Sequence, residues 1–256
     1  MSDERADRLA RLYDLDTCDE DDDIDLVVAL ARRTGGPILE LAAGTGRVSV
    51  PLARAGYDVT AVDVDRSALA RAENRFAPSR GPGSLRLVEA DLLELDLKTR
   101  YRLVLLCLNT LMLLAEREGQ VAALRSMARH LEPGGLAVVD VWLPGPEDLA
   151  QYDGRLLLEW IRTDPETGEE VMKLGSATYD AATDVVSLST IFDATPAGGG
   201  PVTRLVRSDS LRIVRAADLC QMAAEAGLEV ESLAGDRELS PFGPGADRVV
   251  LLARLV

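Results

Sequence analysis

Two acidic residues and two glycines in the first quarter of the chain are well suited to bind a polar ligand. Glu40 lies near the end of a short apolar run, and Gly44 and Gly46 follow it in a Gly-x-Gly turn. Asp63 ends the next apolar run. Glycine lets the backbone turn sharply and lets a ligand approach it closely. A carboxylate at Asp63 can accept hydrogen bonds from both hydroxyls of a ribose. The pattern therefore indicates a nucleoside-containing cofactor.

The residues around the turn argue against a nicotinamide dinucleotide. A dinucleotide turn carries a third glycine at the position of Ser49, where helix and strand pack closely beside the pyrophosphate. Glu40 would repel a pyrophosphate, whereas it suits a cationic group such as an amine or a sulfonium. A nicotinamide oxidoreductase is therefore the less favoured interpretation.

Five motifs, in order, resemble those of the class I S-adenosylmethionine (SAM)-dependent methyltransferases. The first runs from Glu40 to Gly46 and has the family's form hydrophobic-hydrophobic-[Asp/Glu]-x-x-x-Gly-x-Gly. The others are Asp63, the segment Glu89-Ala-Asp91-Leu92, the apolar run 103–108 followed by Asn109-Thr-Leu, and Leu131-Glu-Pro-Gly-Gly135 before the apolar run 136–141. The resemblance covers roughly residues 10–145 and extends more loosely into the C-terminal part. It implies an enzyme that transfers a methyl group from SAM.

The resemblance also implies roles for individual residues. Glu40 would bind the amino group of the methionine part of SAM, and Asp63 would bind the ribose hydroxyls. Asp91 would receive the exocyclic amine of adenine, with Leu92 beside the ring and Val64 covering one face. The full set of implied cofactor-binding residues is Tyr13, Glu40, Ala42, Gly44, Gly46, Asp63, Val64, Asp91, Leu92, Cys107 and Leu108.

The segment 108–111 is expected to lie near the transferred methyl group. It reads Leu-Asn-Thr-Leu, where related small-molecule methyltransferases carry a Phe-Asn-Ser-Leu-like segment, so an aromatic residue is missing. The pair Tyr13-Asp14 resembles a Tyr-Asp pair that can close over the cofactor in this group. Cys107 is interpreted as a wall of the site and not as a nucleophile. Methyl transfer depends mostly on holding the reactants in line, so the sequence identifies no catalytic residue.

The implied reaction is methylation of a small molecule, with an amine nitrogen as the favoured acceptor atom, as in sugar-amine and other small-metabolite N-methyltransferases. Such an acceptor must lose a proton before attack, and an acid or tyrosine could take it. Tyr152, Tyr179 and Asp209 are candidates that the sequence does not rank. Alternatives are O-methylation of a small metabolite and a noncatalytic protein that binds SAM or a nucleoside. The sequence leaves open the acceptor and the choice between a monomer and a homodimer.

These residues would be positioned by an α/β fold with a doubly wound, mostly parallel seven-stranded sheet. Apolar runs alternate with helical patterns, which is typical of parallel sheets. Asp65 is expected to cap the helix that begins at residue 66. The expected strands are 37–41, 58–63, 85–90, 102–108, 136–142, 228–234 and 247–255, and the expected helices include 4–14, 24–33, 47–55, 117–131 and 215–226.

The pattern changes after about residue 150. Four runs rich in β-branched and aromatic residues, at 156–162, 171–179, 185–192 and 203–214, are separated by turn signals. We expect an inserted antiparallel β meander that forms a substrate lid. The expected organisation is a SAM-binding core with N-terminal helices (1–150), the lid (151–214), and a C-terminal helix and strands that complete the core sheet (215–256).

Charge and composition narrow the partners. The net charge of −15, from 28 basic and 43 acidic residues, argues against nucleic acid. The acidic run 19–23 is expected to be a solvated loop that caps the next helix. No apolar run is long enough to span a membrane, no leader is recognised, and three dispersed cysteines suit a reducing cytoplasm. The single histidine, His130, argues against a histidine-cluster metal site and is expected to complement the dipole at a helix end.

Overall fold

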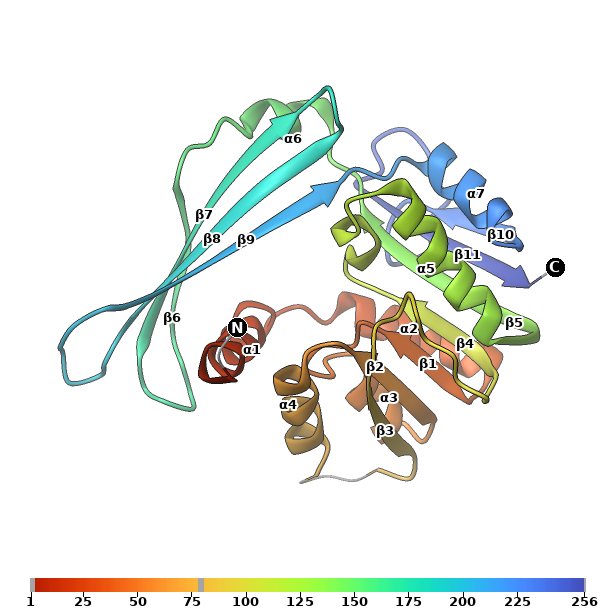
Figure 1. The fold of residues 1–256 in the computed structure, drawn as a ribbon, viewed down its shortest axis with the longest axis horizontal. Coiled ribbons are helices and arrows are strands. Elements are labelled where there is room, and N and C mark those ends of the chain that lie inside the picture. Colours follow the sequence, from red (N-terminus) through yellow and green to blue (C-terminus); the bar gives the residue numbers. More distant parts are fainter. Residues whose placement is uncertain (1–2, 78–80, 256) are drawn as a thin grey trace.

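The computed structural model describes residues 3–77 and 81–255, so residues 1–2, 78–80 and 256 lie outside the described part. Its main sheet has seven strands in the order β10-β11-β5-β4-β1-β2-β3. A second sheet has four strands in the order β6-β7-β8-β9 and extends to one side of the main sheet as a long twisted arm (Figure 1). The predicted fold class is therefore confirmed.

The main sheet is parallel except at one edge. Its strands are β1 (Ile38–Leu41), β2 (Asp58–Asp63), β3 (Ser84–Glu89), β4 (Tyr101–Leu106), β5 (Leu131–Trp142), β10 (Leu228–Ala234) and β11 (Arg248–Leu255). Strands β1 to β5 pair in parallel, and β11 is antiparallel to β5 and β10. The chain winds from β1 outward through β2 and β3, then returns to β4 on the other side of β1. Strand order thus reverses between β1 and β4, the kind of place where open α/β sheets bind ligands.

Helices cover both faces of this sheet. They are α2 (Asp22–Thr34), α3 (Ser49–Arg54), α4 (Arg66–Phe76), α5 (Arg117–His130) and α7 (Ala216–Glu225). Helix α1 (Asp3–Asp16) packs on the second sheet instead, α6 (Pro146–Gln151) leads from β5 into that sheet, and a 3-10 helix spans Thr110–Leu113. Alternate strand residues enter two separate cores, as the two-residue period of a strand requires. Leu39 and Val104 pack with α5 and α7, whereas Ile38 and Leu103 pack with α2 and α3.

Local signals set several element boundaries as predicted, and others differ. The Asp65 side chain accepts hydrogen bonds from the backbone N–H groups of Ser67 and Ala68, which confirms the predicted cap of α4. Helix α3 begins at Ser49 and not at residue 47, so Arg47 belongs to the turn. Helix α6 was not predicted, and β5 begins at residue 131, five residues before the expected start at 136.

The second sheet is called the lid sheet here after its predicted role, which stays a prediction. It is an antiparallel meander of β6 (Leu157–Thr163), β7 (Glu170–Asp180), β8 (Val185–Thr195) and β9 (Thr203–Arg212), and the predicted meander is confirmed. One of its faces packs on α1, where Phe192 and Leu205 form a third core with Leu12 and Leu15. Helix α1 consequently lies between the lid sheet and α4 (Figure 1). Across residues 3–77 and 81–255, no helix is both long and apolar enough to cross a membrane.

Candidate functional site

The structure brings Glu40, the glycine turn and Asp63 together at the carboxyl ends of β1 and β2. Glu40 pairs with Ala61 in the parallel register, so Asp63 ends the neighbouring strand just beyond it. The backbone N–H of Gly44 donates to Asp63 Oδ2 at 2.7 Å. On the other side of β1, Glu40 pairs with Leu105, so the residues that follow β4 lie at the same sheet edge. These residues were predicted from the sequence to share one site.

Asp63 fixes the turn and keeps capacity to bind a ligand. Its Oδ1 accepts from the backbone N–H of Asp65 at 2.8 Å, and its Oδ2 accepts from that of Gly44. Burial raises the pKa of Asp63, while these backbone donors act in the opposite direction. Because a carboxylate has about four acceptor positions, two backbone bonds leave room for two hydroxyl donors.

The two glycines have different functions in the turn. Both have positive φ, +54° for Gly44 and +75° for Gly46. A Cβ added at Gly46 would lie 2.7 Å from the Cβ of Ala72 in α4, whereas one added at Gly44 would meet nothing within 4 Å. Gly46 is therefore required for packing, and Gly44 faces open space at the site. Ala42 also has a left-handed backbone, with φ of 55°, and such strain is common at functional sites.

Alanine substitutions should separate these two functions. We expect Gly46→Ala to lower the free energy of unfolding by about 2–3 kcal/mol, because a left-handed alanine and a steric clash both cost energy. Gly44→Ala should cost only about 1–2 kcal/mol but should weaken binding of S-adenosylhomocysteine, because the new methyl group points to the ligand side. Thermal melting and titration calorimetry measure the two effects. Equal melting temperatures for the two variants would contradict this assignment.

Glu40 is buried and has one nearby hydroxyl donor. It is only 4% exposed, and the Ser49 hydroxyl donates to its carboxyl group. Burial raises the pKa of Glu40 to about 8. Ser49, which argues against a dinucleotide turn in the sequence, thus has a positive role as the partner of this acid. A cationic ligand group beside Glu40 would favour its ionised form.

A buried ion pair beside Glu40 was missed by the sequence analysis. The Arg47 guanidinium binds both carboxylate oxygens of Asp23, with 2.7 Å between Nη1 and Oδ1. Asp23 is 1% exposed, so the prediction that the acidic run is a solvated loop is wrong for this residue. The physical reason is that Arg47 compensates the buried charge. Burial raises the pKa of Tyr13, and the charges of Arg47 and Glu40 also act on it, so Tyr13 lies beside this group.

Two unpartnered polar atoms in the turn provide a test of whether SAM fits. Thr45 Oγ1 and Arg47 Nε are buried and have no hydrogen-bond partner among the described residues. Buried polar groups nearly always have one, so a missing partner indicates a ligand or water. The methionine part of SAM carries a carboxylate, which suits Thr45 and Arg47, and an ammonium, which suits Glu40. The residues present therefore fit the cofactor.

The residues assigned to the adenine lie next to Asp63, at the surface. Val64 is 66% exposed, which is unusual for a valine and leaves an apolar surface available to a ring. The backbone N–H of Ala90 donates to the Asp63 carbonyl at 3.0 Å, which ties the end of β3 to this position. Asp91 is exposed and accepts the backbone N–H of Leu93 at 2.8 Å, while Leu92 is half-buried. Their roles toward adenine stay predictions.

The segment after β4 forms a sharp, well-held turn. Leu108 and Asn109 both have left-handed φ values, 51° and 61°. The Asn109 side chain accepts the backbone N–H of Trp142 at 2.6 Å, which fixes the turn to the end of β5. Burial raises the pKa of the Cys107 thiol well above its usual range, in agreement with a wall residue and not a nucleophile.

A second charged network supports the same sheet edge and has no signal in the sequence. Asp140 of β5 is 2% exposed and accepts from Arg248 Nε at 2.7 Å and from Arg237 at 3.3 Å. Arg237 also binds Asp22 at the start of α2, with 2.5 Å between Nη1 and Oδ1. The members of this network are far apart in the chain, so their spacing in the sequence could not have shown that they are partners.

His130 lies far from the site, at the amino-terminal ends of the strands, just before β5 begins. It is fully buried, its Nε2 accepts the backbone N–H of Leu97 at 3.0 Å, and its Nδ1 lies 2.7 Å from the Ser126 carbonyl. Burial lowers the pKa of His130. Because Nε2 accepts, Nδ1 carries the proton and donates to a carbonyl of the last turn of α5, so His130 complements this helix end as a neutral hydrogen-bond donor and not as a cation.

The three candidate proton acceptors each have a different environment. Tyr152 packs against Trp142 with ring centroids 6.1 Å apart, near the carboxyl end of β5. The Tyr179 hydroxyl donates to Asp184 at 2.6 Å. Asp209 pairs with Arg207 at 2.7 Å. Tyr152 is therefore the candidate that the structure places at the sheet edge of the site.

Comparisons with known proteins agree with this geometry. Residues 38–135 match the family described as "Methyltransferase domain". The chain is 30% identical over 208 residues to the cypemycin N-terminal methyltransferase of a Streptomyces species, a match of 81% of this chain and 78% of the relative.

Two solved structures are similar over nearly the whole chain. One is a SAM-dependent methyltransferase from Clostridium acetobutylicum, with 20% identity, a TM-score of 0.79 and coverage of 97% of this chain and 98% of that one. The other is the CcbJ methyltransferase of Streptomyces caelestis, with 27% identity, a TM-score of 0.76 and coverage of 92% and 90%.

Proposed function

We propose that this chain, which belongs to the SAM-dependent methyltransferases, methylates an amine nitrogen of a small molecule. The chain is thus an enzyme, and bound SAM supplies a methyl group on a sulfonium that is already an activated leaving group. The protein must hold the cofactor, exclude water and place the acceptor in line.

The residues of the glycine turn are proposed to hold the two ends of the cofactor. Glu40 would bind the ammonium, which would favour its ionised form, and Thr45 and Arg47 would bind the carboxylate through Oγ1 and Nε, which have no partner among the described residues. Asp63 would bind the ribose hydroxyls through the acceptor positions that Gly44 and Asp65 leave free. This arrangement would fix the sulfonium near the end of β4.

One observation carries the proposal that the acceptor is an amine. The polar groups that follow β4 are already engaged or protonated: Asn109 Oδ1 accepts from Trp142, Thr110 Oγ1 donates to the Cys107 carbonyl at 2.7 Å, and the pKa of Cys107 is raised. An alcohol oxygen is a weak nucleophile until a base removes its proton, whereas a neutral amine attacks through its nitrogen lone pair without such a base. The Streptomyces relative is named for methylation of an N-terminus, which supports the same chemistry.

The lid sheet and the charge of the chain support a small acceptor. Two basic side chains of β9 are paired with acids of the same sheet, Arg204 with Asp193 and Arg207 with Asp209. They are therefore not free to follow a phosphate backbone, and the net charge of −15 opposes one. We propose that residues 151–214 cover a metabolite or a short peptide end and not a nucleic acid.

Matched amine and alcohol acceptors test whether the enzyme methylates nitrogen or oxygen. Release of S-adenosylhomocysteine should be measured with a panel of amines and with the matching alcohols, in which only the nitrogen is replaced by oxygen. We expect turnover with amines, with rates that rise with pH through the pKa of the acceptor, because only its neutral form attacks. Turnover of an alcohol at a rate equal to or above that of its amine would contradict the proposal.

A further inference from the structure

Asp14, the residue after Tyr13, fixes α1 to α4. Its Oδ2 accepts from Arg71 Nε at 2.7 Å, and its Oδ1 accepts from Arg75 at 2.6 Å. The Asp14 side chain is 14% exposed, so solvent screens these bonds less than those of a surface pair. A carboxylate that binds two guanidinium groups in this way is among the stronger charged contacts in proteins.

Arg71 also contacts the lid sheet. Its two terminal nitrogens bind Glu166, in the turn between β6 and β7, with 3.3 Å between Nη1 and Oε2. One guanidinium group of α4 therefore joins an acid of α1 to an acid of the lid turn. Because these three segments are far apart in the chain, Arg71 is the point where their positions become linked.

Further ion pairs join α1 to the lid sheet directly. Arg11 contacts Asp164 at 3.0 Å and Glu169 at 3.1 Å, and Lys173 contacts Asp16 at 2.7 Å. With the apolar contacts of Leu12 and Leu15, these pairs make α1 and the lid sheet a single unit. That unit is attached to α4 through Asp14 and Glu166.

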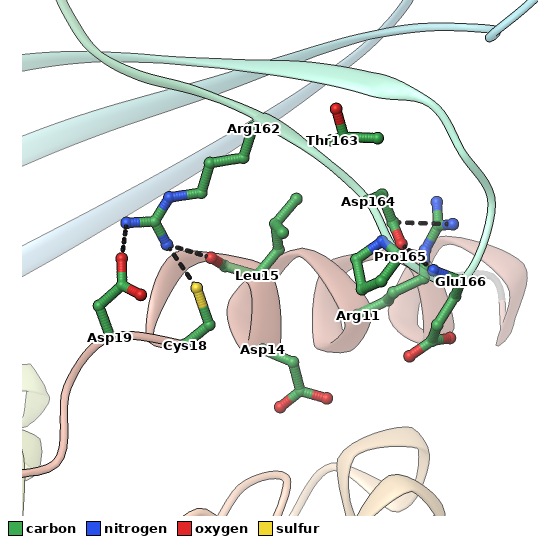
Figure 2. A pocket seen from close by; sticks show the side chains of 10 residues that line it. All are labelled: Arg11, Asp14, Leu15, Cys18, Asp19, Arg162, Thr163, Asp164, Pro165 and Glu166. Atoms are coloured by element: carbon green, nitrogen blue, oxygen red, sulfur yellow. Dashed lines mark hydrogen bonds and ion pairs between the residues drawn. The ribbon is translucent and has the colours of Figure 1, made fainter.

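The contact between α1 and the lid sheet is here called the seam. A cavity lies along it, between α1 and the end of β6 (Figure 2). Its volume is about 470 Å³, and Asp14 and Glu166 both line it. The seam is incompletely packed here, so charged contacts contribute to holding it together.

Tyr13 links this seam to the cofactor site. It lies beside Arg47 and Glu40, which both act on its pKa, while the adjacent Asp14 binds α4. We propose that Asp14, Arg71 and Glu166 form a bridge of positioning residues that holds α1, and with it Tyr13, closed over the cofactor site. The inference rests on the proposed cofactor site at Glu40 and Asp63.

A bridge of this kind predicts a specific kinetic signature. The contacts do not involve the cofactor, so they stabilise the closed arrangement equally with and without it. If α1 must open for exchange, weakening the bridge should raise the association and dissociation rate constants by the same factor. The dissociation constant, their ratio, should not change, because a contact without differential affinity shifts no binding equilibrium. A general structural defect would not speed association.

Stopped-flow binding of S-adenosylhomocysteine to the full chain tests the bridge. We expect Glu166→Gln to raise both rate constants about two- to fivefold, the range for a partly exposed ion pair. Asp14→Asn should raise both about tenfold, because it weakens two contacts. The matched control is Asp193→Asn, which removes a similar pair with Arg204 on the same sheet and should bind at wild-type rates.

Two results would overturn the bridge. One is wild-type rate constants in both Glu166→Gln and Asp14→Asn. The other is a raised dissociation constant with an unchanged association rate, which would make these residues part of the cofactor site itself. Failure of the cofactor site is recognised separately, because Asp63→Ala would then bind with wild-type affinity whatever the bridge variants do.

Discussion

Replacing Glu40 with alanine is expected to weaken binding of SAM and S-adenosylhomocysteine by about 100-fold or more, because removing one partner of a buried charge pair costs about 3–5 kcal/mol. The partner in question is the ammonium of the cofactor. Glu40→Gln is the matched variant, since glutamine keeps the size of the side chain and an oxygen that accepts from Ser49. Titration calorimetry with S-adenosylhomocysteine measures both variants.

The pH dependence of binding gives Glu40 a distinct signature. With a pKa of about 8, the empty site holds a neutral acid at pH 6, and that acid must lose its proton to pair with an ammonium. Affinity should therefore rise by about tenfold per pH unit as pH rises toward 8 and level off above it. Glu40→Gln should show no such rise. Affinity in the wild type that is constant from pH 6 to 8 would contradict this role.

The same pKa shift affects stability with a defined sign. The unfolded carboxyl has a pKa near its ordinary value of 4.5, and the folded one has a pKa of about 8. Unfolding thus releases a proton between these values, so this group's contribution to the free energy of unfolding falls as pH rises from about 4.5 to about 8. The free energy of unfolding should therefore be measured at several pH values for the wild type and for Glu40→Gln. The difference between the two proteins isolates Glu40, because the contributions of the other titrating groups cancel.

Asp63→Ala should give the second large effect, a loss of about 10- to 100-fold in cofactor affinity, because hydrogen bonds to a charged acceptor contribute about 1.5–3 kcal/mol. The variant also leaves the N–H groups of Gly44 and Asp65 without their acceptor, so the turn should loosen. Melting temperature must be measured beside affinity to separate the two contributions.

Asp58→Ala is the control for Asp63→Ala on the same strand. Asp58 begins β2, is exposed and accepts from the Ser84 hydroxyl at 2.5 Å, at the edge of the sheet away from the site. The Asp58→Ala variant should bind the cofactor with wild-type affinity. Equal affinities for the wild type and a folded Asp63→Ala variant would show that Asp63 does not bind the ribose.

The fold could be predicted because its signals are local. The apolar runs of β1 and β4, the Gly-x-Gly turn and the cap at Asp65 each follow from neighbouring residues. Alternation of such runs with helical patterns then leaves few ways to arrange a parallel sheet. The position of Glu40, Gly44 and Asp63 at one sheet edge follows from that arrangement.

The charged contacts could not be predicted, because they join residues that are distant in sequence. Asp23 looks like one acid in a solvated run until Arg47 is placed against it. Asp140 and Arg237 find each other only through the sheet order. Arg47 had one available signal: it is the cation next to the glycine turn, and a cofactor carboxylate needs a cation.

The most direct test of the account is a crystal structure of the protein with S-adenosylhomocysteine. We predict that both ribose hydroxyls lie within hydrogen-bond distance of Asp63, with the amino group beside Glu40 and the carboxylate beside Thr45 and Arg47. Electron density for the ligand elsewhere, for example in the cavity between α1 and β6, would contradict the account. So would a cofactor in this turn whose amino group lies away from Glu40.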